Sequence, residues 1–268
     1  ESPHVMVLMD DPKKQLLEAL YEERMSFKKL YDTDLMEDGG HVTGYAVTGV
    51  HAERVSARLQ QMEAACPGIF LAVGDGNHSL ASAKTCWENA KKDLTEEEQA
   101  DHPMRYALVE AVNLYSPSLL FYPIHRVLYN CDDNTLASGF AEYLKKQDMR
   151  LAQTDDDAQA DVTFLYKENK SSYKIGNRSG HLPVELLQKY LDEYLKEHPE
   201  QELDYVHSEA AAEHIAKDRR GCAMILGAFD KSSLFDAIEA GGVLPRKTFS
   251  IGEDIQKRYY MECRKLTK

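Results

Sequence analysis

The fold is decided by the stretch Ile69-Phe70-Leu71-Ala72-Val73-Gly74-Asp75-Gly76-Asn77-His78-Ser79-Leu80-Ala81-Ser82-Ala83. Its first five residues are apolar and follow Pro67-Gly68, so they predict a buried strand that is too short to be a helix. Gly74-Asp75-Gly76 then interrupts the apolar run, and a helix is expected from about Asn77 to Ala90, with Asn77 or Ser79 as its N-cap. The sequence therefore predicts a strand, a glycine turn and a helix in immediate succession.

A turn of this kind can hold a phosphate, because the first N–H groups of a helix are unpaired and carry the positive end of its dipole. Asp75 could ligate a metal or act as a base, and His78 could donate a proton or contact the phosphate. The alternative is a structural junction, since such turns are common in α/β proteins. The stretch matches neither the Walker loop nor the G-x-G-x-x-G dinucleotide motif.

Composition limits the classes of function. The 268 residues suffice for one large or two ordinary domains, and 43% hydrophobic with 29% charged residues describes a globular protein. The net charge of −13 argues against nucleic acid as a partner. No apolar run approaches the ~20 residues of a membrane span, and no signal peptide is visible. Nucleic acid and membrane are therefore not expected as partners.

The cysteines are odd in number, widely spaced and form no C-x-x-C pair. This pattern predicts reduced thiols and a cytoplasmic protein rather than disulfides or a zinc site. The chain starts at Glu1 and almost at once enters a strand, so we expect a segment to precede it. The cysteines are Cys66, Cys86, Cys131, Cys222 and Cys263.

Apolar strands alternate with amphipathic helices along the whole chain, which predicts a mixed α/β (α+β) fold. A turn at Ser116-Pro117-Ser118 suggests two lobes, 1–116 with the phosphate-binding turn and 117–268 with a second α/β arrangement. Besides the opening stretch, strands are expected at 4–9, 42–50, 105–114, 121–128, 161–166, 172–175, 203–207 and 222–229. Helices are expected at 13–23, 52–65, 134–146, 183–197, 209–217 and 231–240, and 30–41 is expected to be a polar connection.

A few polar residues outside the turn also attract attention. Asp10 and Asp11 follow a strand and could ligate a metal, but capping the next helix is favoured. Arg126 is a possible anion contact, although an arginine beside His125 on a strand more often belongs to surface or core. Arg246 and Lys247 lie in a loop with two hydroxyls that could close on a phosphorylated ligand. A solvated turn is the alternative.

Several stretches together resemble the domain-of-unknown-function 1015 proteins of bacteria and archaea. Members typically carry a further N-terminal segment. The resemblance rests on residues 4–12, Gly39-Gly40-His41, Asp75-Gly76-Asn77-His78, Arg105-Tyr106-Ala107-Leu108-Val109, residues 123–128, Asp204-Tyr205-Val206-His207 and Pro245-Arg246-Lys247-Thr248.

The central motif of that family, usually Asp-Gly-His-His-Arg, is similar to the phosphate-binding turn of the ParB/sulfiredoxin-like superfamily. That superfamily includes free-serine kinases. Here Asn77 replaces the first His and Ser79 the Arg, whereas Asp75, Gly76 and His78 are kept. Serine cannot replace a planar guanidinium clamp. The resemblance then implies that the cation comes from elsewhere, from Arg105, Arg126, Arg246 or Lys247.

The resemblance implies a phosphotransferase that uses ATP or ADP with Mg²⁺ on a small hydroxylated metabolite such as serine. Asp75 would bind Mg²⁺ or accept the proton of the hydroxyl, and His78 would contact phosphate. A non-catalytic ligand-sensing or scaffolding module is the alternative. Further phosphate contacts are expected from Gly74, Gly76, Asn77, Ser79, Arg126, Arg246 and Lys247.

Overall fold

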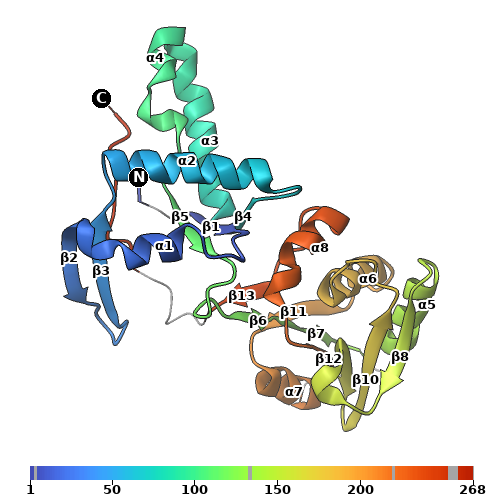
Figure 1. The fold of residues 1–268 in the computed structure, drawn as a ribbon. Helices are drawn as coiled ribbons and strands as arrows, with labels where there is room; N and C mark the ends of the chain where they lie inside the picture. Colours follow the sequence, from blue (N-terminus) through green and yellow to red (C-terminus); the bar gives the residue numbers. More distant parts are fainter. Residues whose placement is uncertain (3–4, 132–134, 219–220, 253–258, 268) are drawn as a thin grey trace. The chain divides into compact units, whose positions relative to one another are not determined.

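A computed structural model describes residues 1–2, 5–131, 135–218, 221–252 and 259–267 (Figure 1). Contacts between backbone segments divide the chain into two compact units. Unit 1 contains Glu1–Leu119 and the C-terminal residues 259–267, and unit 2 contains Leu120–Gly252. Each unit combines helices with β-sheet, so the predicted mixed α/β class is confirmed.

The C-terminal residues 259–267 group with unit 1, although the sequence suggested that they belong to a second lobe. A long-range ion pair and a backbone hydrogen bond account for the difference. Arg264 Nε lies 2.6 Å from Glu1 Oε2, and the Arg264 N–H donates to Glu1 O at 2.9 Å. Contacts between residues so distant in sequence leave no local pattern.

Unit 1 is built on a three-stranded sheet of order β4-β1-β5. The strands are β1 (Val5–Met9), β4 (Leu71–Asp75) and β5 (Val109–Asn113). β1 runs antiparallel to β4 and parallel to β5. The helices of the unit are α1 (Leu17–Glu22), α2 (Val50–Ala65), α3 (Asn77–Ala90) and α4 (Glu96–Ala100). Its small core joins Met9, Leu16, Met62 and Phe70.

Helix α1 is shorter than the 13–23 that the sequence predicts. Asp11 Oδ2 accepts the backbone N–H groups of Gln15 at 2.6 Å and Leu16 at 3.0 Å. Lys14 adopts a positive φ of 54°. The predicted capping by Asp11 is wrong, because its carboxylate accepts N–H groups of the loop before the helix. The N-cap is Leu16, which has no side-chain cap, and helical geometry begins only at Leu17.

The polar connection predicted at 30–41 is wrong, because β2 (Lys28–Asp34) and β3 (His41–Ala46) form an antiparallel hairpin. The residues of β2 are largely polar and exposed, so the alternation that usually reveals a strand is absent there, whereas β3 agrees with the start of the strand expected at 42–50. The Tyr31 ring lies across Gly44, where a Cβ would come within 2.2 Å of Tyr31 Cζ. A residue without a side chain therefore lets the ring cover the hairpin.

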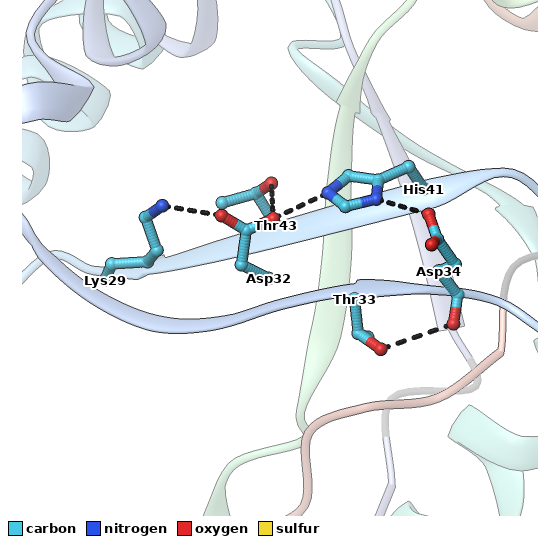
Figure 2. A network of polar contacts seen from close by, with 6 residues as sticks. All are labelled: Lys29, Asp32, Thr33, Asp34, His41 and Thr43. Atoms are coloured by element: carbon cyan, nitrogen blue, oxygen red, sulfur yellow. Dashed lines mark hydrogen bonds and ion pairs between the residues drawn. The ribbon is translucent and has the colours of Figure 1, made fainter.

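A network of charges crosses this hairpin (Figure 2). His41 Nδ1 lies 2.7 Å from Asp34 Oδ1, and its Nε2 lies 2.6 Å from Asp32 Oδ1. These hydrogen bonds, first that to Asp34 and then that to Asp32, raise the pKa of His41. Hydrogen bonds from Lys29 and His41 lower the pKa of Asp32 to about 2. An imidazolium has two N–H donors, so the arrangement favours the charged ring.

We expect the hairpin to loosen as pH rises. Because the pKa of His41 is higher in the folded chain, its stabilising effect is complete below its unfolded pKa of about 6.5. The effect is lost as pH rises through the folded pKa. The backbone amide shifts of Thr33 and Val42, followed by NMR from roughly pH 5.5 to 8.5, should titrate together with His41. The same titration in His41→Asn should be flat, and an unchanged titration there would contradict this assignment.

Unit 2 is built on an antiparallel six-stranded sheet of order β11-β7-β12-β9-β10-β8. The strands are β7 (His125–Tyr129), β8 (Arg150–Thr154), β9 (Val162–Tyr166), β10 (Asn169–Gly176), β11 (Glu202–Val206) and β12 (Gly221–Leu226). The helices are α5 (Leu136–Lys145), α6 (Pro183–Glu197), α7 (Glu209–Asp218) and α8 (Leu234–Gly241). Two further strands, β6 (Phe121–Pro123) and β13 (Phe249–Ile251), form a separate antiparallel pair.

Alternate residues of the central strands enter two different cores. Phe164 and Met224 pack with α5 and α6, whereas Leu165 and Ala223 pack with α7. Successive side chains of a strand point to opposite faces, so helices cover the sheet on both sides (Figure 1). This explains why these strands appear in the sequence as continuous apolar runs.

Two further expectations concern the chain as a whole. In the part of the chain that the structure describes, none of the five cysteines is in a disulfide, and burial raises the pKa of Cys222. Among the described helices, none has the length and apolar composition that crossing a membrane requires.

Candidate phosphate-binding site

The predicted strand, turn and helix are present, but the strand is not buried as predicted: β4 begins at Leu71, lies at the edge of its sheet and has no buried residue. β4 ends at Asp75, which pairs with Met6 of β1, and α3 spans the predicted Asn77–Ala90. The N-cap differs from the prediction: it is Gly76, in the left-handed region at φ 87° and ψ 22°, and no side chain caps the helix. A glycine is favoured here because a Cβ is strained at this φ.

The turn offers backbone donors, but fewer than the sequence suggests. The Gly76 N–H already donates to Asp75 Oδ1 at 2.7 Å. Across the described residues, no acceptor is present for the N–H groups of Asn77, His78 and Ser79. These three donors lie in the first turn of a helix of 14 residues, where the positive end of the dipole adds to them. An anion at this point can be bound by Asn77–Ser79.

The side chains of the turn reach solvent and border a cavity. Asp75, Asn77 and His78 are exposed, while Gly74, Gly76 and Ser79 are partly buried. A mostly apolar cavity of about 420 Å³ begins at His78 and Ser79. It continues along one face of α3 past Ser82, Ala83 and Cys86, and its other wall includes Val5, Tyr106 and Leu108. A ligand bound at the turn would have space for a larger apolar or aromatic group.

Three cations that the sequence assigned to this site belong to unit 2. Arg126 is fully buried there. Its Nε donates to Gln188 Oε1 at 3.2 Å, its Nη1 donates to Ile124 O, and its guanidinium lies 5.2 Å from the centre of the Tyr205 ring. Burial lowers the pKa of Arg126 to about 10. Arg246 and Lys247 are exposed residues of the loop after α8.

His125, the neighbour of Arg126 on β7, is also a core residue. Its Nδ1 accepts the Leu226 N–H at 3.1 Å, and burial, with the charge of Arg126, lowers its pKa to about 4. His125 is therefore neutral near pH 7 and joins two strands. The expectation that this pair belongs to surface or core, rather than to catalysis, agrees with these positions.

The family's sequence profile, described as a protein of unknown function (DUF1015), matches residues 1–205. The chain belongs to the DUF1015 family. The resemblance to this family that its motifs suggest is therefore confirmed. Among curated proteins, no sequence matches this DUF1015 chain.

Several solved structures are similar to it in outline. One is a conserved hypothetical protein from Pyrococcus furiosus, with 12% identity, coverage of 95% of this chain and 93% of that one, and a TM-score of 0.40. A second is a free serine kinase in complex with AMP, with 14% identity, coverage of 94% and 88%, and a TM-score of 0.39. A mutant free serine kinase with ADP gives 15% identity, coverage of 94% and 89%, and a TM-score of 0.40.

A second polar cluster in this DUF1015 chain lies at the other end of β1. Asn113 Nδ2 donates to Asp11 O at 3.0 Å and to Glu18 Oε1 at 2.9 Å, and the Tyr115 hydroxyl donates to Asp10 Oδ1 at 2.7 Å. Asp11 and Asn113 are buried. The sequence placed these residues at two strand ends, and the parallel pairing of β1 with β5 joins them. In the part of the chain that the structure describes, no three acidic, histidine or cysteine side chains surround a common metal position.

Proposed function

We propose that this protein is a nucleotide-dependent phosphotransferase that uses ATP or ADP and acts on a small hydroxylated metabolite such as serine. The observation that supports it is the uncapped start of α3, with the N–H groups of Asn77–Ser79 beside a cavity of about 420 Å³. The N–H groups would bind phosphate, and the cavity would take the nucleoside. Unit 1 would then be the phosphate-binding domain.

Asp75 is suited to the reacting end of the ligand. Its exposed carboxylate stands one residue before the N-cap, and its Oδ1 is oriented by the Gly76 N–H at 2.7 Å. The hydroxyl oxygen of the metabolite would attack the terminal phosphorus, the bond to the bridging oxygen of the nucleotide would break, and the hydroxyl proton would pass to Asp75. The nucleotide leaves one phosphate shorter.

The carboxylate of Asp75 is a suitable ligand for a Mg²⁺ ion that the phosphates of the nucleotide also bind. It usually keeps several waters and binds through one or two carboxylates together with substrate phosphates, so a single exposed Asp75 suffices on the protein side. Bound there, Mg²⁺ would neutralise phosphate charge and remove the repulsion between phosphate and Asp75. His78, exposed in the first turn, would contact the phosphate from the other side.

A non-catalytic ligand-sensing module is the second candidate, and one observation favours it. Ser79 occupies the position where the family motif has an arginine, and Arg126 is buried within unit 2. Phosphate binding without a guanidinium clamp is weaker and stabilises a transition state less. A chain of this kind could bind a metabolite and lack turnover.

Thermal unfolding with different ligands distinguishes the two candidates, because a ligand that binds the native state raises the midpoint. Nucleotides with and without Mg²⁺, serine and phosphoserine are tested separately. A shift with nucleotide that needs Mg²⁺, together with phosphorylated product, supports the phosphotransferase. A shift with metabolite alone and no product supports the sensing module.

His78→Ala is expected to weaken nucleotide affinity about tenfold, because a hydrogen bond to a charged phosphate is lost. Isothermal titration with ADP measures the change. His207→Ala, an exposed histidine of unit 2, is the matched control and should bind as the unchanged protein does. Equal affinity of all three proteins would remove His78 from the site.

A further inference from the structure

A second cavity lies wholly within unit 2, at the end of its sheet where β12 ends and β9 begins. It has a volume of about 210 Å³. The residues that line it include those at the start of α6 and also Gly227, Asp161 and the buried Thr248. Drug-sized ligands occupy cavities of about 300–1,000 Å³, so an occupant of this one is small.

Hydrogen-bond donors line one part of this cavity. α6 has Leu182 as its N-cap, with no side-chain cap, and Pro183 supplies no N–H. Val184 is buried, and within the described ranges no acceptor is present for its N–H. The first N–H groups of a helix have no acceptor within the helix, so other protein groups, water or a ligand can accept from them. The N-terminal dipole of a 15-residue helix adds positive potential at the same point.

Arg178 adds a full positive charge. The nearest carboxylate oxygen is Asp161 Oδ1, at 3.7 Å from Arg178 Nη1, which is too long for a hydrogen bond. Across the described residues, the Arg178 guanidinium makes no closer polar contact. Its planar donors suit a carboxylate. Arg178 and Val184 both border the cavity, and a guanidinium and a backbone N–H are donors of the kind that a carboxylate group accepts.

Carboxylates also border the cavity, and one of them is close to Arg178. Asp161 Oδ2 accepts the Ile175 N–H at 2.7 Å, so the side chain is held in place while Oδ1 is only loosely paired with Arg178. Asp230 also borders the cavity, and its Oδ1 accepts from Ser232. Leu182, Leu226 and Phe229 supply apolar walls between the charged groups. A small anion alone would face two carboxylates, whereas a ligand with both charges would satisfy both sides.

The geometry points to a binding site for a small zwitterionic α-amino acid in unit 2. Its carboxylate would bind Arg178 and the Val184 N–H, and its ammonium group would bind Asp161, with Asp230 near. This inference does not rest on the proposed phosphotransferase, since the site lies in the other unit and requires no hydroxyl on the ligand.

Isothermal titration of the whole chain with L-alanine, acetate and methylamine tests the inference. L-Alanine has no hydroxyl to be phosphorylated, so its binding is independent of any transfer reaction. We expect L-alanine to bind at least about tenfold more tightly than either fragment, because each fragment loses one charge-assisted contact. NMR should show the Val184 amide proton moving downfield with L-alanine. Acetate binding as tightly as L-alanine, or no heat and no Val184 shift, would overturn the inference.

Variants separate the two halves of the site. Arg178→Met should weaken L-alanine about tenfold or more, and Asp161→Asn should weaken L-alanine while leaving acetate equal or tighter. Asparagine can still accept the Ile175 N–H, so folding should persist. Arg150→Met, an exposed arginine of the same unit that does not border the cavity, is the control. An equal loss in Arg150→Met would show a general charge effect and contradict the site.

Discussion

Asp75→Asn is expected to reduce phosphoryl transfer by at least about 100-fold while nucleotide affinity stays equal or becomes tighter. Asparagine keeps an oxygen that can accept the Gly76 N–H, so the turn should persist. It cannot take the proton of the attacking hydroxyl. When ADP is titrated without Mg²⁺, removing a negative charge beside phosphate also removes repulsion, so binding of the nucleotide should not weaken. Product formation measures the first effect, and titration with ADP measures the second.

The matched control is Asp101→Asn, an exposed aspartate of unit 1 outside the turn, which should keep full activity. Full transfer in Asp75→Asn would exclude Asp75 as base and as Mg²⁺ ligand. Loss of both transfer and nucleotide affinity would instead indicate that the turn itself had changed. The amide shifts of Asn77 and His78 distinguish that outcome, because they report the start of α3 directly.

Phe140→Ala is expected to destabilise unit 2 by about 3–5 kcal/mol, the cost of removing a buried aromatic side chain. Phe140 has no exposed surface, and its ring centre lies 5.4 Å from that of Tyr190 and 6.2 Å from that of Phe164. It therefore joins α5, α6 and the sheet. A domain has a total free energy of unfolding of about 5–15 kcal/mol, so this change removes a large part of it.

Chemical denaturation, with hydrogen exchange measured in β9 and β12, follows this effect within unit 2. Phe140→Leu is the control: it fills much of the same space and should cost less than about 2 kcal/mol. A loss below about 1 kcal/mol in Phe140→Ala would mean that α5 is not essential to this core.

The helices and strands of unit 2 could be predicted well because its central strands are buried on both faces and its helices are amphipathic. Leu165 and Ala223 belong to one core and Phe164 and Met224 to the other, so the apolar signal is strong. Strand β2 was missed for the opposite reason, although its partner β3 lies largely within the strand expected at 42–50. The residues of β2 are mostly exposed, and Asp32 and Asp34, which contact His41 of β3, are of a type equally common in loops.

The candidate site was predictable in position but not in detail. The limits of α3 follow from a local break in apolar periodicity, which Gly76 creates. The N-cap and the number of available donors depend on backbone angles, since Gly76 adopts φ 87° and gives its N–H to Asp75. The part played by Arg126 depends on its burial beside Gln188 and Tyr205, which are far from it in the chain.

By itself the sequence determined the mixed α/β class, the DUF1015 membership, and the strand, glycine turn and helix that begins at Asn77, because these depend on local periodicity and motifs. Only the tertiary structure decided which donors remain at that turn, which unit holds each cation, and that Arg178, Asp161 and the Val184 N–H border one cavity. Burial and pairing depend on residues that the fold brings together from distant parts of the chain, and local sequence carries no record of them.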